Sequence, residues 1–81
     1  MNAHELETYR GFTIHIAVHE MPKQWVCEIT FERAEQQACK CSPPMFRHQA
    51  CRLKRSMLTF SMEMQFKARM LVDEWIGKQP D

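Results

Sequence analysis

Residues 12–31 decide the fold of this chain, and they read FTIHIAVHEMPKQWVCEITF. Over residues 12–19, aliphatic or aromatic residues alternate with polar or small ones, and a second alternation of this kind runs over residues 25–32. A period of two residues is typical of a half-buried β-strand. Between the two segments, Pro22 supplies the fixed dihedral angle of a turn. We therefore predict an antiparallel hairpin with one apolar and one polar face.

A helix is predicted after the hairpin, near the end of the sequence. Apolar residues from Met64 to Trp75 recur at spacings of three and four, which indicates one buried stripe along an α-helix. Ser61 is a suitable N-cap, and Glu63 would lie in the first turn, where the helix dipole favours an acid. A glycine and a proline follow the stripe and would end the helix. The pattern predicts a helix over about residues 61–77.

The segment between the hairpin and the helix has weaker signals. Residues 33–44 lack periodicity and contain two consecutive prolines, so we expect a loop. Over residues 45–60, two alternatives stay open. Alternation from Phe46 to Leu53 indicates a strand, and residues 57–60 are a second candidate. We expect one or two further strands in this region.

The chain has 81 residues, which is the size of one domain. We predict an α+β fold, in which an antiparallel sheet of three to four strands carries one C-terminal helix packed on one face. The expected core combines the inward residues of the hairpin with the helix stripe. It comprises Phe12, Ile14, Ile16, Val18, Trp25, Cys27, Ile29, Phe31, Ala68, Leu71, Val72 and Trp75.

Composition excludes several classes of protein. Hydrophobic residues make up 44% of the chain and charged residues 26%, which is typical of an ordered globular domain. The first residues are polar, which is unlike a signal peptide, and the apolar stretches are too short to cross a membrane. We expect a cytoplasmic protein with reduced thiols. With two glycines in the chain and no triad or paired-carboxylate pattern, we expect neither an enzyme nor a bound cofactor.

Three cysteines and one histidine lie close together in the middle of the sequence. Zinc takes four tetrahedral thiolate or imidazole ligands, and this segment offers Cys39, Cys41, His48 and Cys51. The spacing is irregular, because structural zinc sites usually place two to four residues between paired ligands, whereas only one residue separates Cys39 from Cys41. A structural zinc site is therefore one hypothesis, and a loop with incidental thiols is the alternative.

Basic residues are concentrated in the same part of the sequence. Residues 36–62 carry five basic side chains and no acidic one, although the net charge of the whole chain is +1. Such clustering favours contact with nucleic acid, and a solvated segment that balances the acidic residues elsewhere is the alternative. The polar face of the hairpin has glutamates in place of stacking aromatic residues, which argues against binding of RNA there. The candidate residues are Lys40, Arg47, Arg52, Lys54 and Arg55.

The predicted helix has a second apolar row. Met62, Phe66 and Met70 fall on roughly the opposite side from the buried stripe, and a two-layer domain buries only one side of a lone helix. Scattered exposed apolar residues are common, but methionine and phenylalanine also form adaptable binding surfaces. Our leading hypothesis is a small non-catalytic interaction domain that binds a protein partner or a second copy of itself, since a chain this short holds only a thin core.

The order of landmarks resembles a group of small uncharacterised bacterial domains with a β-β-β-α layout. The landmarks are the segment from Tyr9 to Phe12, Trp25 in the second strand, and a helix that ends with Trp75 and Ile76. The resemblance implies one helix on an antiparallel sheet and a bacterial cytoplasmic setting, and it implies no activity. The chain departs from the group at Gly77, where an aspartate is usual, and in its cysteine-rich insert.

Overall fold

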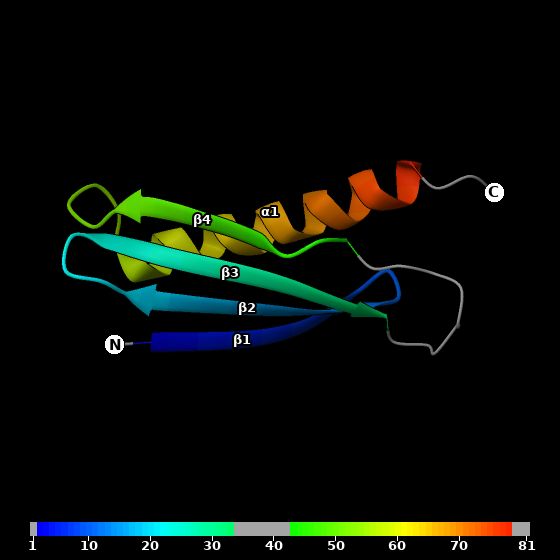
Figure 1. The fold of residues 1–81 in the computed structure, drawn as a ribbon, viewed down its shortest axis with the longest axis horizontal. Coiled ribbons are helices and arrows are strands. Elements are labelled where there is room, and N and C mark those ends of the chain that lie inside the picture. Colours follow the sequence, from blue (N-terminus) through cyan, green and yellow to red (C-terminus); the bar gives the residue numbers. More distant parts are fainter. Residues whose placement is uncertain (1, 34–42, 79–81) are drawn as a thin grey trace.

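The computed structural model describes residues 2–33 and 43–78. Within these ranges, four strands form one antiparallel sheet in the order β1-β2-β3-β4, and one helix packs against a face of the sheet (Figure 1). The predicted α+β architecture is therefore confirmed. The elements are β1 (Asn2–Tyr9), β2 (Phe12–Glu20), β3 (Gln24–Arg33), β4 (Phe46–Cys51) and α1 (Met57–Lys78).

The predicted hairpin is formed by β2 and β3. Ile16 and Val18 of β2 lie opposite Ile29 and Cys27 of β3, and all four side chains are almost fully buried. Directly opposed residues point to the same face of a sheet, so the two alternating patterns meet in phase. The helix covers this face, and the core lies between the two layers.

The core matches the prediction with small differences at its edge. Leu71 and Trp75 pack against the core but are only half-buried, whereas Phe60 and Met64 of α1 are buried in it. Val26 is also buried, although it lies on the sheet face away from the helix, between His19 and Gln49 of the neighbouring strands.

β1 is a strand that the sequence analysis did not predict. Its side chains are mostly polar, so no apolar alternation marks it, and only Ala3 and Tyr9 pack partly against the core. Arg10 and Gly11 join it to β2, with φ angles of 49° and 86°. Two successive residues with positive φ form a turn whose twist matches that of a hairpin. Gly11 therefore supports a sharp bend at this position.

α1 begins one turn earlier than the sequence predicts. The backbone N–H of Thr59 donates to Ser56 Oγ at 3.2 Å, and the N–H of Phe60 donates to the Ser56 carbonyl at 3.0 Å. Ser56 is therefore the N-cap. The prediction of Ser61 as N-cap is wrong, because Ser61 is buried inside the helix, and Glu63 lies beyond the first turn. Both serines suit a cap by local chemistry, and the earlier start places Phe60 in the first turn of α1, where it is buried.

β4 resolves the two alternatives for residues 45–60. The alternating segment is the strand, and residues 57–60 are the first turn of α1. His48 of β4 lies opposite Cys27, so it shares the sheet face that carries the helix. Most of the predicted loop, residues 34–42, lies outside the described residues.

A row of polar contacts, which we call the β1–α1 ladder, joins the first strand to the helix. The two elements run in the same direction, and the contacts recur every two residues along β1 and every four along α1. Two strand residues span about 6.6 Å and four helical residues rise about 6.0 Å, so the two repeats stay in step. The donor–acceptor pairs are Gln65 to Glu5, Arg69 to Glu7 (2.7 Å) and Tyr9 to Asp73 (3.0 Å).

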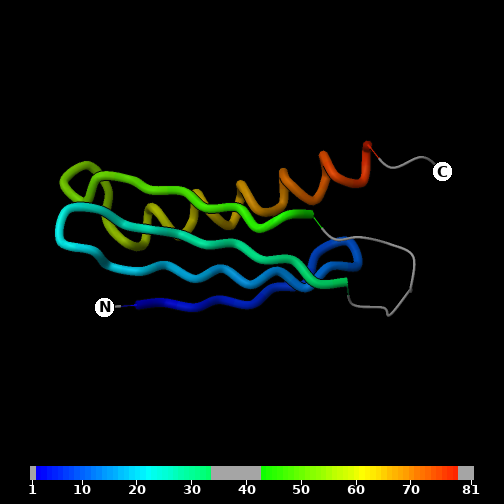
Figure 2. Tube along the Cα trace, in the orientation of Figure 1, coloured from blue at the N-terminus to red at the C-terminus, as the bar shows by residue number. Residues whose placement is uncertain are grey.

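The β2–β3 turn and the β4–α1 connection lie at the same end of the molecule (Figure 2). The backbone N–H of Arg52 donates to the Lys23 carbonyl at 3.3 Å and links the two segments directly. Arg52, one of the basic residues singled out in the sequence, therefore meets the tip of the hairpin.

Candidate functional site

The four residues of the zinc hypothesis are only partly within the described structure. Cys39 and Cys41 lie outside the described residues. His48 and Cys51 are three residues apart on β4, so their side chains point to opposite faces of the strand. The His48 ring stacks between those of Phe46 and Phe60, with centroid separations of 6.2 and 6.1 Å. In the part of the chain that the structure describes, no three potential ligands gather into a metal site.

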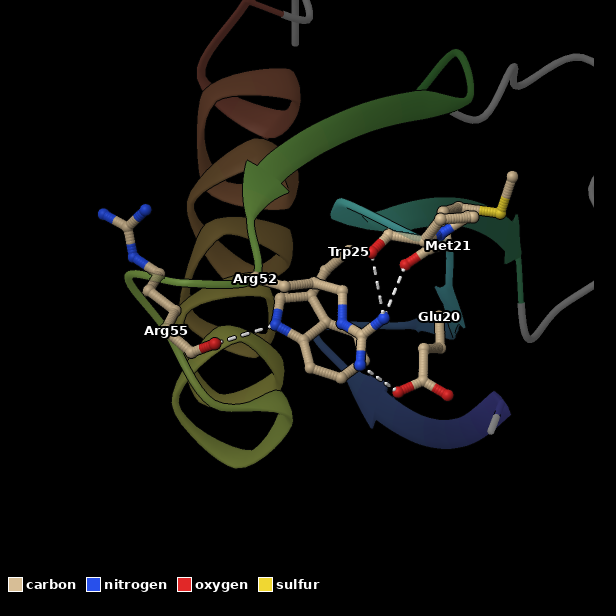
Figure 3. Close-up of polar contacts among 6 residues, drawn as sticks. Glu20, Met21, Trp25, Arg52 and Arg55 are labelled. Atoms are coloured by element: carbon tan, nitrogen blue, oxygen red, sulfur yellow. Dashed lines mark hydrogen bonds and ion pairs between the residues drawn. The ribbon is translucent and has the colours of Figure 1, made fainter.

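Arg52 is the most heavily engaged of the basic residues. Its Nη2 donates to Glu20 Oε2 at 2.7 Å, and its Nη1 donates to the carbonyls of Met21 and Pro22 at 2.9 and 3.3 Å (Figure 3). The guanidinium carbon also lies 5.0 Å from the ring centre of Trp25. A planar guanidinium suits simultaneous pairing and stacking of this kind. Arg52 therefore fastens the β4–α1 connection to the end of β2.

Trp25 contributes a second tie between the same segments. Its indole Nε1 donates to the Arg55 carbonyl at 2.8 Å, while its ring belongs to the hydrophobic core (Figure 3). We refer to Glu20, Met21, Pro22, Trp25, Arg52 and Arg55 as the Arg52 cluster. The Arg52 guanidinium and the Trp25 indole N–H both have partners within the molecule, which indicates a structural role.

The other basic candidates do not gather around Arg52 as one surface. Arg47 lies opposite Glu28 on the sheet face away from the helix. Arg55 pairs through Nε with Glu63 at 2.8 Å, and Lys54 is exposed in the β4–α1 connection. Lys40 lies outside the described residues. Among the candidates that the structure describes, the basic side chains do not form the continuous stripe that would follow a phosphate backbone.

A hollow of about 610 Å³ lies beside the Arg52 cluster. Its walls combine apolar and basic residues, including Leu53, Lys23 and Arg52. Lys23 and Lys54, which are both exposed, are the nearby cations suited to an anionic partner. Nucleic-acid binding at this hollow stays a prediction.

The outward side of α1 carries an apolar row that stays uncovered. The spacing of four residues places its members one turn apart along the helix. We call this set the outward row, and its members with their exposed fractions are Leu58 (71%), Met62 (59%), Phe66 (66%) and Met70 (40%).

Leu58 is the member of the outward row that the sequence analysis missed. The predicted helix began at residue 61, and Leu58 therefore fell outside it. The correct N-cap at Ser56 is the signal that would have included Leu58. With it, the row extends from the first turn of α1 to the fourth.

The two edges of the outward row differ in chemistry. On the β4 side lie Glu63, which pairs with Arg55, and Lys67, whose ammonium is 5.5 Å from the ring centre of Phe46. On the other side lies the β1–α1 ladder. The row is therefore an apolar strip bounded by charged residues, which is the usual anatomy of a protein-binding surface.

Histidines and glutamates occupy the sheet face away from α1. His15 Nε2 is 3.5 Å from Glu32, and His19 Nε2 is 3.3 Å from Glu28, so β2 and β3 pair across the hairpin as the sequence predicts. The rings of His4 and His15 are stacked, with centroids 5.7 Å apart. These contacts are ordinary cross-strand pairs.

Cys27 is chemically quiet. Burial raises the pKa of its thiol to about 11, so the nucleophilic thiolate is scarce near neutral pH. The thiol is fully buried within the apolar core, as the sequence analysis predicts. Cys27 therefore acts as a small core residue.

α1 does not have the properties of a membrane span. Among the described residues, no helix combines the length and the hydrophobicity needed to cross a bilayer. Comparison with known proteins does not place the chain in a family. The resemblance to bacterial β-β-β-α domains stays a prediction. Searches against protein-family models, curated proteins and solved structures find no match to the chain.

Proposed function

We propose that this chain is a non-catalytic interaction domain that binds a protein through the outward row of α1. The observation that carries the proposal is the exposure of Leu58, Met62, Phe66 and Met70, which follow one another at intervals of four residues along α1. Exposed apolar patches bounded by polar residues are typical of interaction sites.

The chemistry of the row supports a protein as the ligand. Methionine is flexible and adapts to varied apolar surfaces, and phenylalanine offers a large area for burial in a partner's pocket. A helix that presents apolar residues one turn apart matches the helix-in-groove and helix-to-helix modes of recognition. The β1–α1 ladder and the core hold α1 in place, so binding would cost little ordering of the helix backbone.

A photo-crosslinking experiment tests the proposal in living cells. The full chain carries p-benzoylphenylalanine at position 66, and a control chain carries it at position 30. Thr30 is exposed on the opposite face of the sheet, so it reports contacts away from α1. We expect covalent protein adducts from position 66 and few from position 30. Equal adducts from both positions, or none from position 66, would contradict the proposal.

Nucleic-acid binding stays an alternative proposal. If the basic side chains act on phosphates, retention on RNA or DNA should weaken with added salt and with removal of the charges of Lys54 and Arg55. Arg52 is unsuitable for this test, because its loss would also break the Arg52 cluster. No retention at low salt would end the alternative.

A structural zinc site is the second alternative, and metal content decides it. Untagged protein should then contain about one zinc ion per chain. A content far below this value removes the hypothesis without affecting the proposal for α1.

A further inference from the structure

We infer that the partner of the outward row is a second copy of this chain, docked so that the two α1 helices run antiparallel. This inference rests on the proposed function, because it uses the same surface. Two-fold pairing is the commonest form of protein self-association, and it requires one patch that is complementary to itself.

The spacing of the outward row satisfies this requirement. Its members are equally spaced by four residues, so the row has the same spacing when read in either direction. In an antiparallel pair, Met62 would lie opposite the partner's Phe66, and Leu58 opposite the partner's Met70. Each apolar side chain therefore meets another apolar side chain, and none meets a charge.

Charges at the edge of the row favour the same arrangement. Glu63 and Lys67 lie on the β4 side of the row, one helical turn apart. A two-fold axis perpendicular to the helices brings the β4 side of one row against the β4 side of the other. Each Glu63 would therefore approach the partner's Lys67. The pair occurs twice by symmetry. Parallel helices would instead bring this edge against the ladder side, where Gln65 and Arg69 already contact β1.

The size of the row predicts a weak and reversible dimer. From Leu58 to Met70 the row spans about 18 Å of helix. Rows spaced by four residues form ridges that pack at a crossing angle of about 50°, which restricts close contact to the centre. A stable interface usually buries about 800 Å² on each partner, more than this strip provides alone. The net charge of +1 adds little repulsion between copies.

Sedimentation velocity of the purified full chain under reducing conditions tests this inference. We expect a monomer–dimer equilibrium that shifts with dilution and is lost in Phe66→Asp. Each of Glu63→Lys and Lys67→Glu should weaken association by roughly tenfold, because each turns two attractions into repulsions. The double variant Glu63→Lys/Lys67→Glu restores the attraction with reversed signs and should recover most of the wild-type affinity.

Control variants separate docking from folding. Glu74→Lys makes the same charge change on an exposed part of α1 outside the row and should leave association near that of the wild type. Thermal unfolding of every variant identifies losses that come from misfolding, which matters because Glu63 also pairs with Arg55. If the affinity of the double variant falls by the product of the two single-variant losses, no charge pair is restored and the antiparallel pairing is excluded.

The outcomes distinguish this inference from the proposed function. Suppose that the purified chain is strictly monomeric and that position 66 gives adducts in cells with a mass other than twice that of the chain. This result would overturn self-association and leave the proposed interaction surface intact. A monomer without such adducts would overturn both. Adducts of twice the chain's mass, with rescue by the double variant, would support both.

Discussion

The Arg52 cluster and the outward row of α1 differ in how far their side chains are satisfied within the molecule. Arg52 belongs to the most unusual part of the sequence, yet its guanidinium binds two carbonyls and one carboxylate and stacks on Trp25. Phe66 belongs to an ordinary amphipathic helix, yet 66% of it is exposed.

This difference teaches that residues conspicuous in the sequence can be engaged within the fold, whereas inconspicuous ones can stay exposed. The Arg52 cluster holds two connections together, and its Arg52 guanidinium is already paired with Glu20 and two carbonyls. The outward row contributes little to the core and keeps its surface available. If this contrast is correct, substitutions in the cluster should affect stability, whereas substitutions in the row should affect association.

The largest expected effect is the loss of the Trp25 side chain. Trp25→Ala empties a buried site and removes the hydrogen bond to the Arg55 carbonyl, so we expect a loss of about 3–5 kcal/mol in the free energy of unfolding. Phe66→Ala should change it by less than about 0.5 kcal/mol in the monomer. Urea unfolding of both variants at low protein concentration measures the contrast, and equal losses would break it.

Removal of the Arg52 guanidinium should have the next largest effect. Arg52→Met keeps the aliphatic part but removes the three hydrogen bonds, and we expect a loss of about 1–2 kcal/mol, reduced by the partial exposure of the pair. Arg47→Met, at an exposed strand position, is the matched control and should be near neutral. If both variants lose the same stability in urea unfolding, Arg52 has no special structural role.

The helix cap should contribute less than the Arg52 cluster. Ser56→Ala removes the acceptor for the Thr59 N–H and should cost about 1 kcal/mol, measured by thermal or urea unfolding. Ser61→Ala should cost less, because alanine favours a helix interior. A larger loss of stability in Ser61→Ala than in Ser56→Ala would instead support a helix that starts near residue 61, and Leu58 would then not belong to the outward row.

The smallest expected effect is a dependence of stability on pH through Asp73. The hydrogen bond from Arg10, assisted by that from Tyr9, lowers the pKa of the Asp73 carboxyl. Its stabilisation is therefore present above the ordinary carboxyl pKa of about 3.9 and is lost as the pH falls through the lower folded value. Urea unfolding at a series of pH values should show a smaller acid-induced loss in Asp73→Asn than in the wild type. Identical profiles would show that the exposed Asp73 pair contributes nothing measurable.

The sequence was informative about the fold wherever burial follows a regular period. β2 and β3 were predictable because Ile14, Ile16 and Ile29 alternate with polar residues, and the stripe of α1 was predictable for the same reason. β1 was not, because its inward positions include Glu5 and Glu7, which the β1–α1 ladder satisfies. A strand whose helix-facing side is largely polar has no apolar signal to read.

The candidate site divides in the same way. Met62, Phe66 and Met70 were identified from helical spacing alone, because the side of a helix that a residue occupies depends on its neighbours along the chain. The basic set was grouped by closeness in sequence, but its members have different environments. Arg52 contacts Glu20, 32 residues away in the sequence, and no local pattern indicates that contact.

By itself, the sequence determined the hairpin, the existence of the helix and the outward position of three of its apolar residues, because each depends on short-range periodicity. Only the tertiary structure decided that Ser56 caps α1, that Leu58 joins the outward row and that Arg52 is engaged internally. These features depend on contacts between distant segments, such as Phe60 with the core and Arg52 with the end of β2. Such contacts form only when the layers pack, so the available surface is known only from the folded chain.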